Sequence, residues 1–301
     1  MRRSFDGLRA AASVGDSTAD TDEAKFNANL LWGFGDDNLG GLIVVDAFKR
    51  NGFYNRDRAI TRDERVPSQQ GIFPSYNWGS FSRDDFVEVG CPDAQRFDGR
   101  PGFPLGSLGA YCALDRSDFT VFDPDLEQLG LYGSFNARFS DSLEFFGELQ
   151  AQRNESFATS APAPWSQANI DAAHPNFPAE LRTRMLARGL GPTQDIAGWG
   201  RFPDERQIDV ETQSWRALAG LRGDLAGDWS WEAAVNYGDS ESEQIASGGI
   251  YNRARTLAAL CGRLLPDGSV PSPARDCIPV AGGLWYNPFG GQAAQDPRVL
   301  A

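Results

Sequence analysis

The chain is poor in the residues on which most catalytic and metal sites depend. Its 301 residues include one histidine, His174. This excludes a metal site made of several histidines, and a Ser-His-Asp triad would have to use this one residue. The phosphate-binding loop, the nucleophile elbow, the HExxH helix and the EF-hand loop are also missing from the sequence. We therefore expect no enzymatic activity, no metal site and no cofactor.

Long apolar runs are missing as well. No stretch approaches the roughly 18 apolar residues of a membrane-spanning helix. The N-terminal stretch MRRSFDGLRAAASVGD has the charged start of a signal peptide but not its apolar core. Two interpretations follow: a cytosolic protein, or part of an exported protein that has lost its own export signal.

Positive charge is scarce. The chain has 28 Lys and Arg against 41 Asp and Glu, which gives a net charge of −13, and lysine occurs only at positions 25 and 49. Binding to nucleic acid requires a basic face. We therefore expect no nucleic-acid partner.

Cysteine occurs four times, as Cys91, Cys112, Cys261 and Cys277. No CxxC spacing is present, which argues against a zinc ribbon or a thioredoxin-like motif. Three pairings are possible. The sequential pairing, 91 with 112 and 261 with 277, would close two loops rich in Gly, Pro and Asp, and would stabilise each by roughly 3 kcal/mol in the chain-entropy picture. Such bonds indicate an oxidising compartment, and four free thiols are the alternative.

A period-two pattern runs through LGLYGSFNARFSDSLEFFGELQAQ, residues 129–152. The odd-numbered positions are apolar or glycine through most of both halves, and the even-numbered positions are mostly polar. This alternation indicates two strands joined by a turn, with one uncharged face. One such hairpin is compatible with a soluble sandwich, and equally with a barrel wall that has lipid outside and water inside.

Seven segments show this alternation, and six of them are about 9–12 residues long. Strands of globular proteins average about 5–6 residues, whereas a tilted strand needs about 9–11 residues to cross a bilayer. The apolar faces carry no charge in their centres, where an arginine would cost about 2–4 kcal/mol inside a membrane. The predicted strands are 8–14, 24–34, 39–48, 129–139, 143–152, 214–225 and 229–238.

Short and long connections alternate along the chain. The short ones, 35–38, 140–142 and 226–228, are polar hairpin turns, and the long ones include 51–125, 154–207 and 243–301. This asymmetry is typical of outer-membrane barrels, which have short periplasmic turns and long external loops. Aromatic residues lie next to the short turns and fit a girdle of rings at the membrane–water interface, and core packing is the alternative. They are Trp32, Phe34, Phe139, Phe145, Trp229 and Trp231.

The faces opposite the apolar ones mix both charge signs with amides. Such a mixture suits the interior of a barrel that holds a plug, and it also suits an open channel. The residues expected to line this interior are Lys25, Asn27, Asn29, Asp46, Arg138, Glu144, Glu148, Gln150, Arg216, Arg222 and Glu232. Within the long connections, we interpret 178–190 and 252–265 as short loop helices.

The chain resembles the TonB-dependent receptors of Gram-negative outer membranes. The resemblance lies in two strand–turn–strand units, KFNANLLWGFGDDNLGGLIVVDAFKRNGFYNRDR and LGLYGSFNARFSDSLEFFGELQAQRNES, and in CGRLLPDGSVPSPARDCIPV followed by LWYNPFGG. It implies an all-β fold, an antiparallel transmembrane β-barrel with long extracellular loops. Family barrels have 22 strands and single-chain bacterial barrels have an even number. We therefore expect 1–301 to be one partial barrel, without plug or TonB box, cut at both ends and with two unpaired edges.

The resemblance also implies a function. The intact parent would be a receptor in the cell outer membrane that imports a scarce ligand: siderophore-bound iron, cobalamin or an oligosaccharide. Its partners would be that ligand, the TonB system through the missing plug, and outer-membrane lipid and lipopolysaccharide. The alternatives are a passive porin-like channel and a soluble β-rich carbohydrate-active or carbohydrate-binding protein.

Aromatic residues of the long connections are the candidate ligand contacts. Loop packing is the competing interpretation for each of them. They are Tyr76, Trp78, Trp165, Trp199, Trp285 and Tyr286.

Overall fold

The chain divides into two compact units, which are described separately. The computed structural model describes residues 5–18, 23–62, 68, 70–72, 74–77, 87–88, 92, 96–97, 111–140, 142–191, 194–225, 227–271, 278–290 and 294–300. The sheet unit comprises Met1–Arg58, Val121–Ala158 and Ile208–Ala246. The loop unit comprises Ala59–Thr120, Thr159–Gln207 and Ser247–Ala301. The expectation that both belong to one partial barrel stays a prediction.

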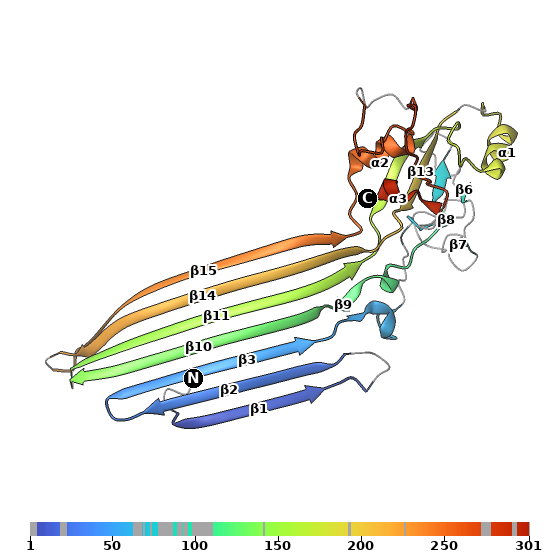
Figure 1. Cartoon of the computed structure of the whole chain (residues 1–301). Coiled ribbons are helices and arrows are strands. Elements are labelled where there is room, and N and C mark those ends of the chain that lie inside the picture. The colour runs from blue at the N-terminus through green and yellow to red at the C-terminus, as the bar shows by residue number, and fades with distance from the viewer. Residues whose placement is uncertain are drawn as a thin grey trace. The chain divides into compact units, whose positions relative to one another are not determined.

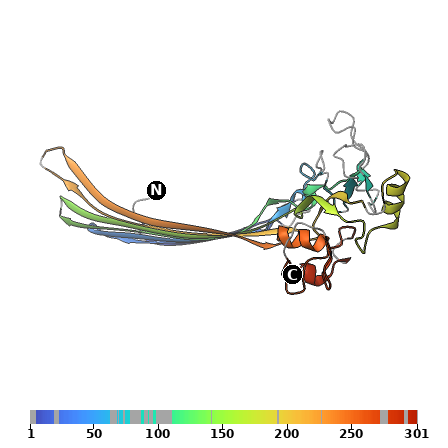
Figure 2. The same ribbon diagram turned by 90° about the horizontal axis from the view of Figure 1, so that it is seen from above.

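Seven strands form the large sheet of the sheet unit, and all seven predicted strands are present. The last four are longer than predicted, with 16, 18, 19 and 19 residues, so the connections predicted at 51–125, 154–207 and 243–301 are shorter than expected. The seven strands lie side by side in a single layer (Figures 1 and 2), in the order β1-β2-β3-β10-β11-β14-β15. Neighbours follow one another along the chain apart from the segments that belong to the loop unit. The strands are β1 (Gly7–Gly15), β2 (Lys25–Gly35), β3 (Leu39–Arg50), β10 (Asp125–Ser140), β11 (Leu143–Ser160), β14 (Arg206–Asp224) and β15 (Ser230–Gly248).

The sheet is open, so the predicted fold class is confirmed only as an antiparallel all-β sheet. β1 and β15 are its two edges and do not pair with each other. Antiparallel neighbours reverse direction at each step, so the two edges of a seven-stranded sheet run the same way, as their arrows show in Figure 1. An antiparallel closure between β1 and β15 is therefore geometrically impossible.

Tight turns join the hairpins where the sequence predicted them. In the turn between β2 and β3, the Asp36 carboxylate accepts hydrogen bonds from the backbone N–H groups of Asn38 and Leu39, both at 2.8 Å. These donors hold the pKa of the Asp36 carboxyl below its usual range. Between β14 and β15, Gly227 has a φ of 82°, a left-handed conformation that glycine adopts without strain.

The loop unit has its own secondary structure, which the sequence analysis predicted only for the two helices. A four-stranded sheet has the order β12-β13-β5-β6. Its strands are β12 (Pro164–Ile170), β13 (Ile196–Arg201), β5 (Ser75–Asn77) and β6 (Val87–Glu88). The helices are α1 (Ala179–Ala187), α2 (Arg253–Leu260) and α3 (Pro297–Leu300).

Short elements complete the described structure. A two-stranded ribbon pairs β7 with β8 in the loop unit, and another pairs β4 with β9 in the sheet unit. These elements are β4 (Phe53–Tyr54), β7 (Arg96–Phe97), β8 (Tyr111–Cys112), β9 (Val121–Asp123) and the 3₁₀ turns Asn55–Asp57 and Arg116–Asp118. Among the described residues, no helix has the length and apolar character needed to cross a membrane.

Helix α2 is shorter than the sequence predicted, because a glycine ends it. Gly262 has a φ of 60°. The backbone N–H of Arg263 donates to the carbonyl of Ala258 at 2.8 Å, and that of Gly262 donates to Ala259. This pair of bonds is the Schellman motif, which satisfies the last carbonyls and stops the helix. The prediction that the helix continues to residue 265 is therefore wrong.

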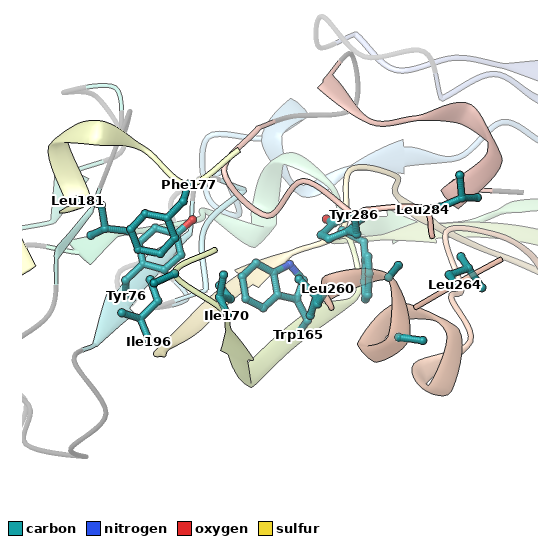
Figure 3. Packing of buried hydrophobic residues seen from close by; sticks show 14 of the residues in the cluster. Tyr76, Trp165, Ile170, Phe177, Leu181, Ile196, Leu260, Leu264, Leu284 and Tyr286 are labelled. Atoms are coloured by element: carbon teal, nitrogen blue, oxygen red, sulfur yellow. The ribbon is translucent and has the colours of Figure 1, made fainter. Parts of the chain in front are cut away.

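A hydrophobic core organises the loop unit. Figure 3 shows residues from several distant segments of the chain packed together, including Tyr76, Trp165, Ile196, Leu260 and Tyr286. The indole of Trp165 lies against Gly198 and Gly200 of β13, where a Cβ atom would come within 2.9 and 2.7 Å of the ring. The two glycines in the sequence IAGWGR therefore make room for this side chain.

Candidate functional site

The strand register places the apolar side chains of neighbouring strands on one surface, which we call the apolar face. Trp32 of β2 lies opposite Leu8 of β1 and Ile43 of β3, and Leu131 of β10 lies opposite Val45. The rings of Trp215 and Tyr237 are 5.3 Å apart on β14 and β15. The apolar face comprises the even-numbered residues of 8–14 and 26–34 and the odd-numbered residues of 39–47, 129–139, 143–151, 215–225 and 229–237.

No residue of the apolar face is charged, and many of its large side chains are exposed. Leu8 is 67% exposed, Trp229 is 75% exposed and Val235 is 76% exposed. Soluble monomers rarely expose apolar patches larger than a few hundred Å². An uncharged surface that crosses seven strands therefore calls for an apolar partner or an apolar solvent.

Charged residues appear on the same face beyond one end of the apolar positions. We call these residues the charged border: Lys49, Glu127, Arg153, Glu155 and Glu211. Lys49 follows the last apolar position of β3 and forms an ion pair with Glu127 of β10. Arg153 of β11 pairs with Glu155 at 2.6 Å and with Glu211 of β14 at 2.9 Å. Exposed pairs of this kind contribute little to stability. Their importance here is that they mark where the uncharged surface ends.

The length of the uncharged span can be calculated along β10. From Leu129 to Phe139, at about 3.4 Å per residue, β10 covers about 34 Å of its own length. A strand tilted by about 45° would convert this to a height of about 24 Å. Lipid-facing bands of outer-membrane barrels are about 25 Å tall.

Aromatic side chains mark the other end of the apolar face, beside the short turns. All six residues predicted to form a girdle have apolar-face positions. The rings of Trp32 and Phe34 are 5.2 Å apart. Indole and phenyl rings at this level suit the interface between hydrocarbon and water.

The opposite face of the sheet, which we call the polar face, carries the predicted charges and amides together with apolar residues such as Leu31, Leu42 and Val44. Arg222 of β14 donates a hydrogen bond of 2.5 Å to Glu144 of β11, and its guanidinium lies 5.2 Å from the ring centre of Phe146. Arg216 donates to Asn236 of β15 at 2.7 Å. Paired charges and amides on this face are accessible for contact with water or with a second polar body.

Three of the six candidate ligand contacts lie inside the core of the loop unit. Tyr76 is 1% exposed, Tyr286 is 4% exposed and Trp165 is 7% exposed. Trp199 and Trp285 are half-buried, and Trp78 lies outside the described residues. The structure thus brings Tyr76, Trp165 and Tyr286 together as packing residues, and contact of any of the six with a ligand stays a prediction.

The two buried phenols are unsuited to acid–base work near neutral pH. Burial raises the pKa of Tyr76 and of Tyr286 well above the ordinary range. The Tyr76 hydroxyl donates to the carbonyl of Pro288 at 3.1 Å. Both rings therefore stay neutral and contribute apolar area to the core.

Of the four cysteine side chains, the structure describes that of Cys261. Cys261 is disulfide-bonded, and no cysteine among the described residues is free. Cys91 and Cys277 lie outside the described residues, and the side chain of Cys112 does too. The sequential pairing therefore stays a prediction.

The sequence analysis missed the role of His174, which is 2% exposed. Its Nε2 lies 2.9 Å from the carbonyl oxygen of Tyr286, and its Nδ1 accepts a hydrogen bond of 3.1 Å from the backbone N–H of Asn176. Nothing in the residues around position 174 predicts this contact, because Tyr286 is far away in the sequence.

Comparisons with known proteins add no family. No family model matches the chain, and no curated protein or solved structure matches it either.

Proposed function

We propose that the chain is part of an outer-membrane β-barrel of a Gram-negative bacterium, with its apolar face against lipid and its polar face toward the barrel interior. The observation that carries the proposal is the shape of the apolar face. It is uncharged over a height that fits a bilayer, it is bounded by the charged border at one end, and it is bounded by aromatic rings at the other. All seven strands contribute apolar positions, and β3, β10, β11 and β14 contribute the charged border.

A soluble sandwich would require a second layer over the apolar face. Among the residues that the structure describes, no such layer is present, since Leu8, Trp229 and Val235 are exposed. A membrane supplies the apolar surroundings without any further protein layer. The open edges β1 and β15 have unpaired backbone groups, and further strands would have to cover them within lipid.

We infer that the intact protein is an active-transport receptor for a scarce ligand: siderophore-bound iron, cobalamin or an oligosaccharide. The polar face supports this inference, because ion pairs such as Arg222–Glu144 suit contact with a plug that moves under energy from the TonB system. The loop unit supports it as well. Its buried core shows that the long connections form a folded body, which could present a surface to a ligand. A passive porin is the competing function for the same barrel.

Uptake measurements in the bacterium that encodes the chain test the transport function. Deletion of the gene is expected to abolish uptake of one labelled ligand class among ferric siderophores, cobalamin and oligosaccharides. Inactivation of the TonB system in the undeleted strain should produce the same loss, because import against a gradient requires energy. Reintroduction of the gene should restore uptake.

The control is a small solute that enters through porins, and its uptake should be unchanged in both strains. Uptake that depends on the gene but not on the TonB system would identify a passive channel instead. Recovery of the protein in the soluble fraction would contradict the membrane assignment itself.

A further inference from the structure

His174 is held in one protonation state by two backbone groups. The N–H of Asn176 is always a donor, so Nδ1 must be an acceptor and carry no proton. The carbonyl of Tyr286 is always an acceptor, so Nε2 must carry the proton and donate it. The folded loop unit therefore requires the neutral imidazole in its Nε2–H form.

The surroundings of His174 are apolar and tightly packed. Its ring lies edge-on to Trp285, with centroids 4.8 Å apart, and edge-on to Phe289 at 5.7 Å. Phe289 also contacts the rings of Tyr76 and Phe177 at 5.2 and 5.5 Å. A proton added to the imidazole would therefore place a charge among aromatic rings.

The segment 284–290, on the other side of the His174 bond, connects distant parts of the loop unit. The backbone N–H of Tyr286 donates to Ala259 at the end of α2, at 3.0 Å. The carbonyl of Pro288 accepts from Tyr76, at 3.1 Å. The side chain of Gln295 accepts from the N–H of Asn287 at 2.9 Å and donates to its carbonyl at 2.7 Å. Release of this segment would loosen contacts with α2 and β5 together.

Few charged groups face the imidazole. The carboxylate of Asp171, in the same turn as His174, raises the pKa of the imidazole through space. It also accepts a hydrogen bond of 2.7 Å from the backbone N–H of Ala173. From α1, Arg182 donates to the carbonyl of Ala172 at 3.0 Å, and its guanidinium lies 5.2 Å from the ring centre of Phe177. Ahead of β13, Asp195 has a raised pKa caused by its burial and by Asp171.

From the segment 284–290, only the neutral phenol of Tyr286 is titratable. No ion pair to His174 is present within the described part of the chain. Burial of the ring is the largest influence and lowers the pKa of His174, whereas the hydrogen bond to the Tyr286 carbonyl and the Asp171 carboxylate raise it.

We propose that His174 is a proton-operated latch, which holds the segment 284–290 in place at neutral pH and releases it in mild acid. Protonation would put an N–H on Nδ1, opposite the N–H of Asn176 at 3.1 Å. Two donors would then face each other, and a cation would lie in the core without a paired carboxylate. The added proton removes the bond from Asn176, whereas Nε2 still donates to the Tyr286 carbonyl. The cation is therefore solvated only when the ring leaves the core, and the segment 284–290 that packs against the ring is then released.

The direction of the pH effect follows from the two states. Burial lowers the pKa of His174 in the closed state, whereas the released imidazole has an ordinary pKa of about 6.5. The released state therefore binds more protons below pH 6.5. The free energy that holds the segment 284–290 in place is therefore largest above about pH 6.5 and decreases as the pH falls below that value.

NMR on the full chain with ¹⁵N-labelled histidine tests the latch without any substitution. Because His174 is the only histidine, the two ring nitrogens give signals from one residue. At pH 8 we expect the Nε2–H form, and on acidification a pKa below 6.5. The hydrogen-exchange protection of the Tyr286 amide, corrected for the intrinsic pH dependence of exchange, should fall by up to about tenfold per pH unit in the same range.

A His174→Gln variant serves as the matched control, since a glutamine side chain offers one donor and one acceptor and has no charge. Its Tyr286 amide should keep constant corrected protection between pH 8 and pH 5. Ordinary titration of His174 at about 6.5 with unchanged protection would overturn the proposal. Equal acid loss of protection in the variant would overturn it as well. Neither result depends on whether the sheet unit contacts lipid.

Discussion

Replacement of Phe135 by arginine is expected to reduce insertion of the chain into lipid vesicles by about 2–4 kcal/mol, or roughly 30- to 700-fold. Phe135 lies near the middle of the apolar face on β10, opposite Gly41 and Gly147. An arginine there would have to leave water for the centre of the bilayer. The partition of protein between vesicles and buffer, measured over a urea series, gives the free-energy difference.

Ser134→Arg is the matched control, because residue 134 is the sequence neighbour on the polar face. Its new guanidinium would lie opposite Glu148, and we expect insertion to change by less than threefold. Equal losses for the two variants would contradict the assignment of the faces. If both positions were exposed on a soluble protein, either substitution would change the free energy of unfolding by less than about 0.5 kcal/mol.

Replacement of Leu181 by alanine is expected to destabilise the loop unit by about 2–5 kcal/mol. Leu181 of α1 is 0% exposed and belongs to the core cluster. The shortened side chain removes buried contacts and leaves a cavity that the surrounding residues fill only partly. Denaturant unfolding, followed by proteolytic cleavage within the loop unit, measures the change.

Leu186→Ala is the control in the same helix, because Leu186 is 53% exposed. Its effect should stay below about 1 kcal/mol, since little buried surface is lost. A loop unit without a cooperative core would show the same small effect at both positions. That result would also weaken the latch, which requires the segment 284–290 to be packed against a stable core.

The strands of the sheet were predictable because one local pattern encodes them. Alternation with period two is visible within any ten residues, and the turns carry residues such as Asp36 and Gly227. The outer ends of the strands were not predictable. In Asp125-Leu126-Glu127-Gln128, the contrast between the faces is too weak for a periodic signal, and pairing with neighbouring strands determines the strand instead.

The loop unit was largely unpredictable because its contacts are non-local. Tyr76, Trp165 and Tyr286 come from three different connections, and no sequence period relates them. Their aromatic character suggested both ligand binding and packing, and only burial distinguishes the two. His174 drew attention as the single histidine, but its bond to Tyr286 spans 112 positions and leaves no local signature.

The central claim is that the apolar face contacts lipid, and the tryptophans of the chain test it directly. Four of them, at 32, 215, 229 and 231, have apolar-face positions, whereas 78, 165, 199 and 285 belong to the loop unit. The measurement is tryptophan fluorescence of the full chain in vesicles of brominated phosphatidylcholine, compared with unbrominated vesicles. Bromine on the acyl chains quenches the rings that lie in the hydrocarbon or at its interface with water, and not rings held away from the bilayer.

We predict strong quenching of the unmodified chain, and loss of most of it when the four apolar-face tryptophans are replaced by phenylalanine. The remaining fluorescence, from the loop unit, should be the same in both kinds of vesicle. Absence of quenching in the unmodified chain, or quenching that persists after the four replacements, would contradict the assignment of this face to lipid.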